Sequence, residues 1–197
     1  ETPQNENTPF NPVSPYAVAK VYGHYMTKVY REGYGLYAVN GILFNHESKR
    51  RVENFVTMKI VTGITNILNG TQTCIELGNI DSKRDWGHAK DYVYGMWLML
   101  QQERPDDYVL ASGKTQTIRH FVEKAFQYKG LVISWSGEGY HEVGKDQHGV
   151  TRVKINPKYF RPCEVEFLLG DATKAREKLG WTFEYDTLDK LIEDMFS

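Results

Sequence analysis

The chain has 197 residues, of which 41% are hydrophobic and 25% charged, and its net charge is −1. These values are typical of a globular protein of one domain or slightly more, and they exclude a disordered or fibrous chain. The balanced charge argues against a nucleic-acid-binding protein, and the sequence contains no run of about 18 apolar residues that would span a membrane.

Helical and strand patterns alternate along the sequence. The expected elements are, in chain order, a loop (1–13), a helix (15–31), a strand (36–44), a polar loop (45–53), a helix (55–68), a strand (74–77), a turn-rich segment (79–86), a helix (88–102), a strand (108–111), a helix (117–128), two strands (131–136 and 151–156) around a glycine-containing loop, and two short helices (172–179 and 188–196). This alternation predicts an α/β fold with a parallel sheet and a smaller C-terminal lobe.

Three of these elements have clear local signals. Ser14 is a good N-cap and Pro15 suits the first helical turn, while 33–35 (GYG) stops that helix as a cap and turn. The apolar run 36–44 predicts a strand buried on both faces. In the helix over 88–102, apolar residues recur at helical spacing, namely Tyr92, Val93, Met96, Trp97 and Leu100.

Tyr16 and Lys20 are four residues apart and therefore share one face of the first helix. The hydroxyl of an unperturbed tyrosine has a pKa of about 10. An ammonium within about 4–6 Å favours the phenolate and lowers that pKa by about 1–3 units. The pair suits proton transfer to or from a substrate hydroxyl, although the same spacing arises by chance in many helices.

Metal and phosphate-loop motifs are incomplete. His46-Glu47 begins a zinc-protease pattern, but Arg50 stands where the second histidine would be, so we expect no metal site. The glycines at 33–35 fit a dinucleotide-binding pattern, yet they end a helix instead of following a strand. Cys74 and Cys163 lie far apart, which predicts free, buried thiols and a reducing, cytoplasmic location.

Arginines allow two interpretations. Arg84 and Arg161 could each clamp a diphosphate through two parallel hydrogen bonds, or could pair structurally with Asp85 and Glu164. The basic run 49–51 is either a solvated surface loop or part of a binding site.

Longer motifs resolve part of this ambiguity. The segment 14–20 (SPYAVAK) resembles the active-site helix of extended short-chain dehydrogenases/reductases. Among these enzymes, the sequence resembles the GDP-mannose 4,6-dehydratase family through further segments. These are 40–48 (NGILFNHES), 54–57 (NFVT), 84–92 (RDWGHAKDY), 159–162 (YFRP) with Glu164, and 169–171 (LGD). The resemblance runs in order along the whole chain and covers the C-terminal half to three-fifths of a family member.

The resemblance implies a role for each matching residue. Tyr16 and Lys20 would be catalytic and would also contact the cofactor NADP. His46 and Arg51 would bind NADP, Arg51 from a loop that meets a neighbouring subunit of a homodimer or homotetramer. The substrate GDP-mannose would be bound by Asn45, Val56, Lys59, Arg84, Arg161 and Glu164.

The implied reaction is an internal redox dehydration. Hydride leaves carbon 4 of the mannose while Tyr16 takes the hydroxyl proton, water is lost from carbons 5 and 6, and the hydride returns to carbon 6. The product is GDP-4-keto-6-deoxymannose, a precursor of GDP-fucose and related deoxy sugars.

The implied domain division makes residues 1–70 the second half of an NADP-binding, Rossmann-like doubly wound sheet. Residues 71–197 would be mostly a sugar-nucleotide-binding lobe with returning elements of that sheet. The glycine fingerprint, catalytic threonine and catalytic glutamate of the family belong before the Tyr motif. We therefore expect an N-terminally truncated chain that is inactive alone, as the opening residues 1–9, which lack an initiator Met, also suggest.

Three positions depart from the family pattern. Val13 and Met58 stand where the family commonly has arginine, and Val52 where it has glycine. Two other hypotheses remain open: a related nucleotide-sugar dehydratase or epimerase that shares the Tyr–Lys pair, and an inactive relic that only oligomerises.

Overall fold

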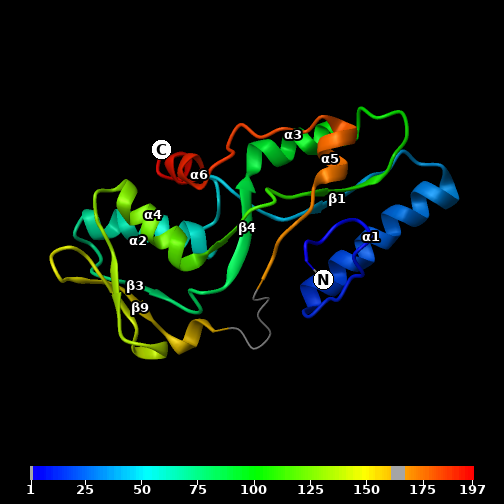
Figure 1. Ribbon diagram of the computed structural model, residues 1–197. Helices are drawn as coiled ribbons and strands as arrows, with labels where there is room; N and C mark the ends of the chain where they lie inside the picture. The colour runs from blue at the N-terminus through cyan, green and yellow to red at the C-terminus, as the bar shows by residue number, and fades with distance from the viewer. Residues whose placement is uncertain (1, 161–166) are drawn as a thin grey trace. The chain divides into compact units, whose positions relative to one another are not determined.

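The computed structural model describes residues 2–160 and 167–197 (Figure 1). The chain forms two compact units, each assembled from three stretches. Unit 1 contains residues 1–46, 85–115 and 168–186, and unit 2 contains residues 47–84, 116–167 and 187–197. The units are interleaved along the chain, whereas the sequence-based division placed one boundary after residue 70. Which unit serves cofactor and which serves sugar nucleotide stays a prediction.

Unit 1 is built on two parallel strands, β1 (Asn40–Leu43) and β5 (Asp107–Leu110), as the sequence predicted. Helix α1 (Pro15–Tyr34) lies on one side of β1, and helices α3 (Ala89–Met99) and α5 (Thr173–Leu179) lie on the other (Figure 1). The core between the strands and α3 and α5 contains Phe44, Tyr92, Met99, Tyr108, Val109, Leu110, Ala111, Ala172, Ala175, Leu179 and Trp181.

The two outer edges of this small sheet differ. On β5, the Val109 N–H donates to Glu6 Oε1 at 2.8 Å, and the Asp107 carbonyl accepts from Lys174 Nζ at 2.8 Å. The Phe44 N–H donates to the Leu110 carbonyl, so the backbone groups of Leu43, one residue earlier, point to the opposite edge. Among the described residues the sheet of unit 1 ends at β1. The β5 edge is therefore closed by side chains, and the β1 edge is the one available to another strand.

Unit 2 contains a mixed sheet of four strands in the order β3 (Ile75–Leu77), β9 (Thr151–Ile155), β8 (Val143–Lys145) and β7 (Ser134–Ser136). β3 and β9 are parallel, and the other two pairings are antiparallel. Helices α2 (Val56–Leu68), α4 (Ile118–Tyr128) and α6 (Leu188–Met195) belong to this unit, with 3-10 turns η1 (Gly139–His141) and η2 (Pro157–Tyr159). A Cβ on Gly63 of α2 would lie 2.6 Å from Ile75 Cγ1, so only glycine permits this approach of α2 to β3.

Three further strands, β2 (Asn45–Glu47), β4 (Lys83–His88) and β6 (Thr115–Thr117), contain points at which the chain passes from one unit to the other. The prediction of a polar loop over 45–53 and a turn-rich segment over 79–86 was wrong where β2 and β4 form. β8 likewise forms inside the predicted loop between residues 136 and 151. These strands are rich in polar residues, and the buried ones, such as Glu47 and Asp85, are stabilised by hydrogen bonds that no local pattern reveals.

Two other predictions need correction. The strand expected over 36–44 is shorter, because its partner β5 pairs only with residues 40–43, and Leu36 and Tyr37 are exposed. Helix α1 extends to Tyr34, one turn beyond the predicted end. It stops at Gly35, whose left-handed φ of 67° and N–H bond to the Tyr30 carbonyl confirm the predicted cap.

The apolar face expected on α3 is only partly buried. Tyr92 is in the core, but Val93, Trp97 and Leu100 are exposed. The helix turns Gly95 toward the core instead, where an added Cβ would lie 2.7 Å from Leu110. The close approach of α3 to β5 thus sets the buried face around Tyr92, Gly95 and Met99, which overlaps only in part with the face that apolar spacing suggested.

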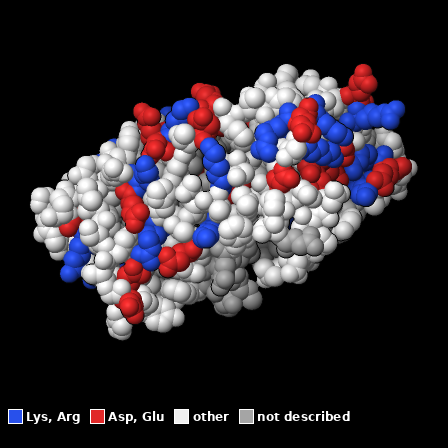
Figure 2. Space-filling model, viewed as in Figure 1, with Lys and Arg blue, Asp and Glu red and all other residues white. Residues whose placement is uncertain are grey.

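Two features of the structure concern the charge balance and the apolar runs considered in the sequence analysis. On the face drawn in Figure 2, the described Lys and Arg side chains are interspersed with Asp and Glu. Within the described residues, no helix combines the length and the apolar character needed to cross a bilayer.

We expect Gly170→Ala to destabilise the protein. An added Cβ would overlap the Cβ of Ala111 and lie 2.9 Å from the Phe44 ring. Overpacking of this kind costs about 1–3 kcal/mol. The matched control is Gly23→Ala in α1, where nothing lies within 4 Å of the new methyl group, and alanine should stabilise the helix by about 0.5–1 kcal/mol. Urea unfolding measures the free energy of unfolding of both variants. Equal values for Gly170→Ala and Gly23→Ala would contradict this packing.

Candidate active site

Tyr16 and Lys20 lie at the beginning of α1, where a helix cap fixes the backbone. Ser14 Oγ accepts a hydrogen bond from the Ala17 N–H at 3.1 Å, and Pro15 occupies the first turn. Lys20 Nζ lies 5.3 Å from the centroid of the Tyr16 ring, which confirms that the two side chains share one face. Tyr16 is 73% exposed, so its hydroxyl is accessible to a ligand.

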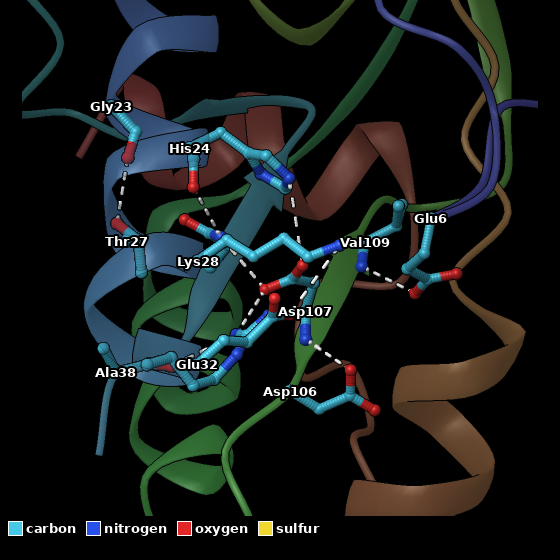
Figure 3. Close-up of polar contacts among 12 residues, drawn as sticks. Glu6, Gly23, His24, Thr27, Lys28, Glu32, Ala38, Asp106, Asp107 and Val109 are labelled. Atoms are coloured by element: carbon cyan, nitrogen blue, oxygen red, sulfur yellow. Dashed lines mark hydrogen bonds and ion pairs between the residues drawn. The ribbon is translucent and has the colours of Figure 1, made fainter. Parts of the chain in front are cut away.

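A polar cluster holds α1 on unit 1. Helix α1 contains no buried residue, so its position depends on contacts other than a buried apolar face. Asp107, at the start of β5, accepts hydrogen bonds from Arg31 Nη1 at 2.7 Å and Asn40 Nδ2 at 3.0 Å. Its other oxygen lies 3.8 Å from His24 Nε2 (Figure 3). Arg31 also donates to the Ala38 carbonyl. This cluster therefore joins two turns of the helix to both strands.

The pKa values of this cluster reflect its geometry. Burial raises the pKa of Asp107, but the hydrogen bonds from Arg31 and Asn40 and the charges of Arg31 and His24 outweigh burial. The pKa of Asp107 is therefore below its usual value. The hydrogen bond to Asp107 raises the pKa of Arg31 despite partial burial. The carboxylate and the guanidinium thus form a stable ion pair in the folded chain.

Asn45 and His46 lie on β2, directly after the core residue Phe44. His46 Nδ1 is 2.8 Å from the Phe44 carbonyl oxygen, which can only accept, so Nδ1 carries the proton. The imidazole stacks on Tyr92 with ring centroids 4.9 Å apart. In the neutral ring, Nε2 is then left as an acceptor, and the side chains of Asn45 and His46 are only half-buried.

Arg51 lies in the loop between β2 and α2 and is oriented by Glu47. Its Nε is 3.0 Å from Glu47 Oε2, and its guanidinium lies over the Phe55 ring at 3.5 Å. Thr57 donates to the same Glu47 oxygen at 2.6 Å. Burial raises the pKa of Glu47, although Thr57 and Arg51 act in the opposite direction. Of the two interpretations of the run 49–51, a solvated loop does not describe Arg51, which is ion-paired and stacked, whereas Arg50 is exposed.

Val56 and Lys59 lie on the first turn of α2. Both are half-buried, and Lys59 Nζ lies 3.5 Å from the centroid of the Tyr159 ring, in a cation–π contact. Met58 is buried on the other face of this turn. An uncharged side chain at position 58 therefore fits its surroundings in this chain.

Arg84 and Asp85 are neighbours on β4 with different environments. Arg84 is half-buried and donates from Nη1 to the Lys83 carbonyl at 2.9 Å. The Asp85 carboxylate is fully buried and accepts from the Ser112 N–H and hydroxyl, the Gly113 N–H and the Gly170 N–H. Burial raises the pKa of Asp85 despite these hydrogen bonds. Asp85 thus anchors β4 to two distant loops of unit 1.

The remaining predicted site residues, Arg161 and Glu164, lie outside the described residues, as does Cys163. Cys74 is a free thiol, half-buried rather than buried, and burial raises its pKa. In the part of the chain that the structure describes, no group of three metal-ligating side chains is close enough to hold an ion.

The predicted residues divide between the two units. Tyr16, Lys20, Asn45 and His46 belong to unit 1. Arg51, Val56, Lys59 and Arg84 belong to unit 2. The structure directly brings together the pair on α1 and the neighbours on β2.

Comparison with known proteins identifies the family. The family model described as GDP-mannose 4,6 dehydratase matches residues 1–195. This chain belongs to the GDP-mannose 4,6-dehydratase family. It is 57% identical to GDP-mannose 4,6 dehydratase of Drosophila melanogaster, covering 99% of this chain and 49% of the fly protein. It is 51% identical to the Homo sapiens protein of that name, covering 99% of this chain and 52% of the human one. The chain therefore spans about half the length of the curated relatives it matches.

Solved structures show the same fold at low sequence identity. The RMD protein of Pseudomonas aeruginosa, complexed with NADPH, matches with a TM-score of 0.81 at 19% identity, covering 99% of this chain and 59% of that protein. A UDP-N-acetylglucosamine 4-epimerase from Methanobrevibacter ruminantium matches with a TM-score of 0.78 at 23% identity, covering 99% and 56%. The predicted α/β fold is confirmed.

Sequence reasoning missed three carboxylates that this dehydratase-family chain uses to build the candidate site. Glu47 was considered as part of a failed zinc motif and of the family segment 40–48 but was given no role, and Asp107 was not singled out at all. Asp85 was considered as a partner of Arg84. The signal that could have found them is an acidic residue inside or beside an apolar strand, since such a residue needs partners when buried.

We expect Asp107→Asn to destabilise the chain by about 2 kcal/mol at neutral pH, because it removes a charge-assisted pair with Arg31. The pKa of Asp107 is lowered in the folded state, so its contribution is full above the unfolded value of about 3.9. It is lost as the pH falls through the folded pKa. Urea unfolding from pH 7 down to pH 3 should show the free energies of unfolding of the wild type and Asp107→Asn converging at the acidic end.

Glu32→Gln is the matched control for this prediction. Glu32 lies on the same helix and pairs with Lys28 at 3.8 Å, but both side chains are exposed. Such pairs contribute less than about 0.5 kcal/mol. An Asp107→Asn variant that behaves like Glu32→Gln would show that the cluster does not hold α1.

Proposed function

We propose that this chain provides the Tyr–Lys helix and the sugar-nucleotide-binding residues of a GDP-mannose 4,6-dehydratase, which converts GDP-mannose to GDP-4-keto-6-deoxymannose. The observation that carries the proposal is the exposed Tyr16–Lys20 pair on a capped helix, in a chain that belongs to this family.

Tyr16 would move a proton at the hydroxyl of mannose carbon 4. Its side chain is exposed at the first turn of α1, and the helix cap at Ser14 limits the motion of that turn. The Lys20 ammonium, 5.3 Å from the ring centroid, attracts the negative charge that develops on the phenol oxygen. The chain therefore offers a general base for removing the proton as the carbon is oxidised.

The cofactor proposed for this reaction is NADP. When bound, NADP supplies reversible hydride transfer. The residues proposed to hold it are Lys20, His46 and Arg51. They fit an anionic, hydrogen-bonding dinucleotide, because Lys20 and Arg51 carry positive charges, and His46, whose Nδ1–H is used by the Phe44 carbonyl, has Nε2 left for a hydrogen bond. Among the described residues, neither Nη of Arg51 has a hydrogen-bond partner.

The residues proposed to bind GDP-mannose are Asn45, Val56, Lys59, Arg84, Arg161 and Glu164. Arg84 is suited to a diphosphate because a guanidinium can donate two parallel hydrogen bonds. Lys59 is held against the Tyr159 ring, which keeps its positive charge at one place on unit 2. Asp85 stabilises the strand that carries Arg84.

The open edge of β1 supports the assignment of unit 1 to a larger nucleotide-binding sheet. Two parallel strands do not make a stable sheet alone, and parallel sheets are normally covered on both faces. The β5 edge is closed by Glu6 and Lys174, so further strands would add beside β1. The chain spans about half of its relatives, and we assign those strands to the other half of the protein.

Subunit assembly is also part of the proposal. Helix α1 exposes large apolar and aromatic side chains along its length, among them Tyr22, Tyr25 and Val29. An exposed apolar surface of this kind is typical of protein interfaces. It supports a homodimer or homotetramer in the whole protein.

The test is a chimaera in which this chain replaces the matching half of the Drosophila melanogaster relative. We expect it to convert GDP-mannose to the 4-keto product, and Tyr16→Phe to lower kcat at least about 100-fold, as for loss of a general base. Binding of GDP-mannose should change less than twofold. Tyr34→Phe, exposed at the far end of α1, is the control and should retain normal kcat. Near-normal turnover of Tyr16→Phe would remove Tyr16 from the mechanism.

Ligand-induced stabilisation of the same chimaera separates the dehydratase from a related epimerase. We expect GDP-mannose to raise its Tm, with about 2.7 kcal/mol of stabilisation at 100 times Kd. UDP-glucose and dTDP-glucose at the same concentration should leave Tm unchanged. A larger shift with either of these would favour the alternative of another nucleotide-sugar enzyme.

A further inference from the structure

The Arg51 guanidinium is held from two directions by residues of unit 2. Its Nε is 3.0 Å from Glu47 Oε2, and its plane lies over the Phe55 ring, with the guanidinium carbon 3.5 Å from the ring centroid. A planar cation that is both stacked and ion-paired has little freedom to rotate. Arg51 is therefore oriented before any ligand arrives.

Glu47 is the fixed point of this arrangement. Its side chain is only 2% exposed, and its Oε2 accepts the Thr57 hydroxyl at 2.6 Å. Thr57 is itself buried on the first turn of α2. The carboxylate is thus held between strand β2 and helix α2, and it can rotate little without breaking a short, buried hydrogen bond. A buried, charged side chain is costly to keep unless its partners are in place.

The opposite edge of the guanidinium is open. Arg51 is 24% exposed at its side chain, and both Nη groups are without hydrogen-bond partners in residues 2–160 and 167–197. Those two nitrogens form the fork that recognises phosphate oxygens. Orientation matters for such recognition, because a free arginine side chain loses rotamer entropy when it binds.

We propose that Glu47, supported by Thr57, is a positioning residue that holds Arg51 so that its two Nη groups face a phosphate of the bound dinucleotide. Glu47 itself contacts no ligand in this proposal. The inference rests on the proposed function only in the assignment of Arg51 to the cofactor.

The orientation of Arg51 is measured directly by NMR of the chimaera described above, with 15N-labelled arginine, because the chimaera supplies the other half of the protein. The Arg51 Nε–H signal is identified by its loss in Arg51→Lys. Arg51 Nε is buried and ion-paired with Glu47 without a well-aligned hydrogen bond, so we expect its N–H signal to be shifted and slow to exchange in the wild type, and to move toward the position of a solvent-exposed arginine in Glu47→Gln. Glu53→Gln removes the same charge from an exposed position of the same loop and should leave the signal unchanged.

The functional consequence is measured by titrating the same samples with inorganic pyrophosphate. We expect the Arg51 signal to respond in the wild type, and the apparent affinity to be about fivefold weaker in Glu47→Gln and unchanged in Glu53→Gln. A fivefold loss corresponds to about 1 kcal/mol. Thermal unfolding of each variant shows whether it is folded. If Glu47→Gln does not fold, Thr57→Val, which keeps the shape but removes the hydroxyl donor, should give a smaller change in the same direction.

Two results would overturn the proposal. One is an Arg51 Nε–H signal that is identical in the wild type and in folded Glu47→Gln or Thr57→Val. The other is a wild-type signal that does not respond to pyrophosphate. Failure of the chimaera to turn over GDP-mannose would count against the proposed function alone, because the NMR measurements need no turnover.

Discussion

A carboxylate that is buried in a protein must accept hydrogen bonds or face a positive charge, and this constraint organises both units of the chain. In unit 1, Asp85 accepts from Ser112, Gly113 and Gly170, and so joins three stretches that are far apart in sequence. Asp91, on α3, accepts from the backbone N–H groups of Glu184 and Tyr185. Because each unit is assembled from separate stretches, such contacts decide which stretches meet.

The candidate catalytic helix depends on the same principle. Helix α1 buries no residue, so hydrophobic packing alone does not explain its position. Asp107 binds Arg31 and lies beside His24, and these residues are two turns apart on α1. The pair Tyr16–Lys20 is therefore presented by a helix that is fixed at its middle by charge and at its beginning by a cap. In unit 2, Glu47 has the corresponding role for Arg51.

Local sequence patterns predicted the helices well. The starts of α1 and α4 follow capping residues, Ser14 and Thr117, whose side chains bond the first turn. The positions of Tyr16 and Lys20 on one face also followed from spacing alone. The short strands were predicted poorly, because β2 and β4 are polar and owe their burial to partners elsewhere in the chain. Residues 36–39 are apolar but form no strand, since β5 offers them no partner.

The sequence by itself determined the family, through motifs long enough to be specific, and it determined the chemistry-bearing pair Tyr16–Lys20, since helix periodicity is a local property. Only the tertiary structure decided which carboxylates hold the site together. Glu47 and Thr57 are ten residues apart, and Asp107 and Arg31 are 76 residues apart. No local pattern encodes such a pairing, because the free energy of burying a charge depends on partners that folding brings together.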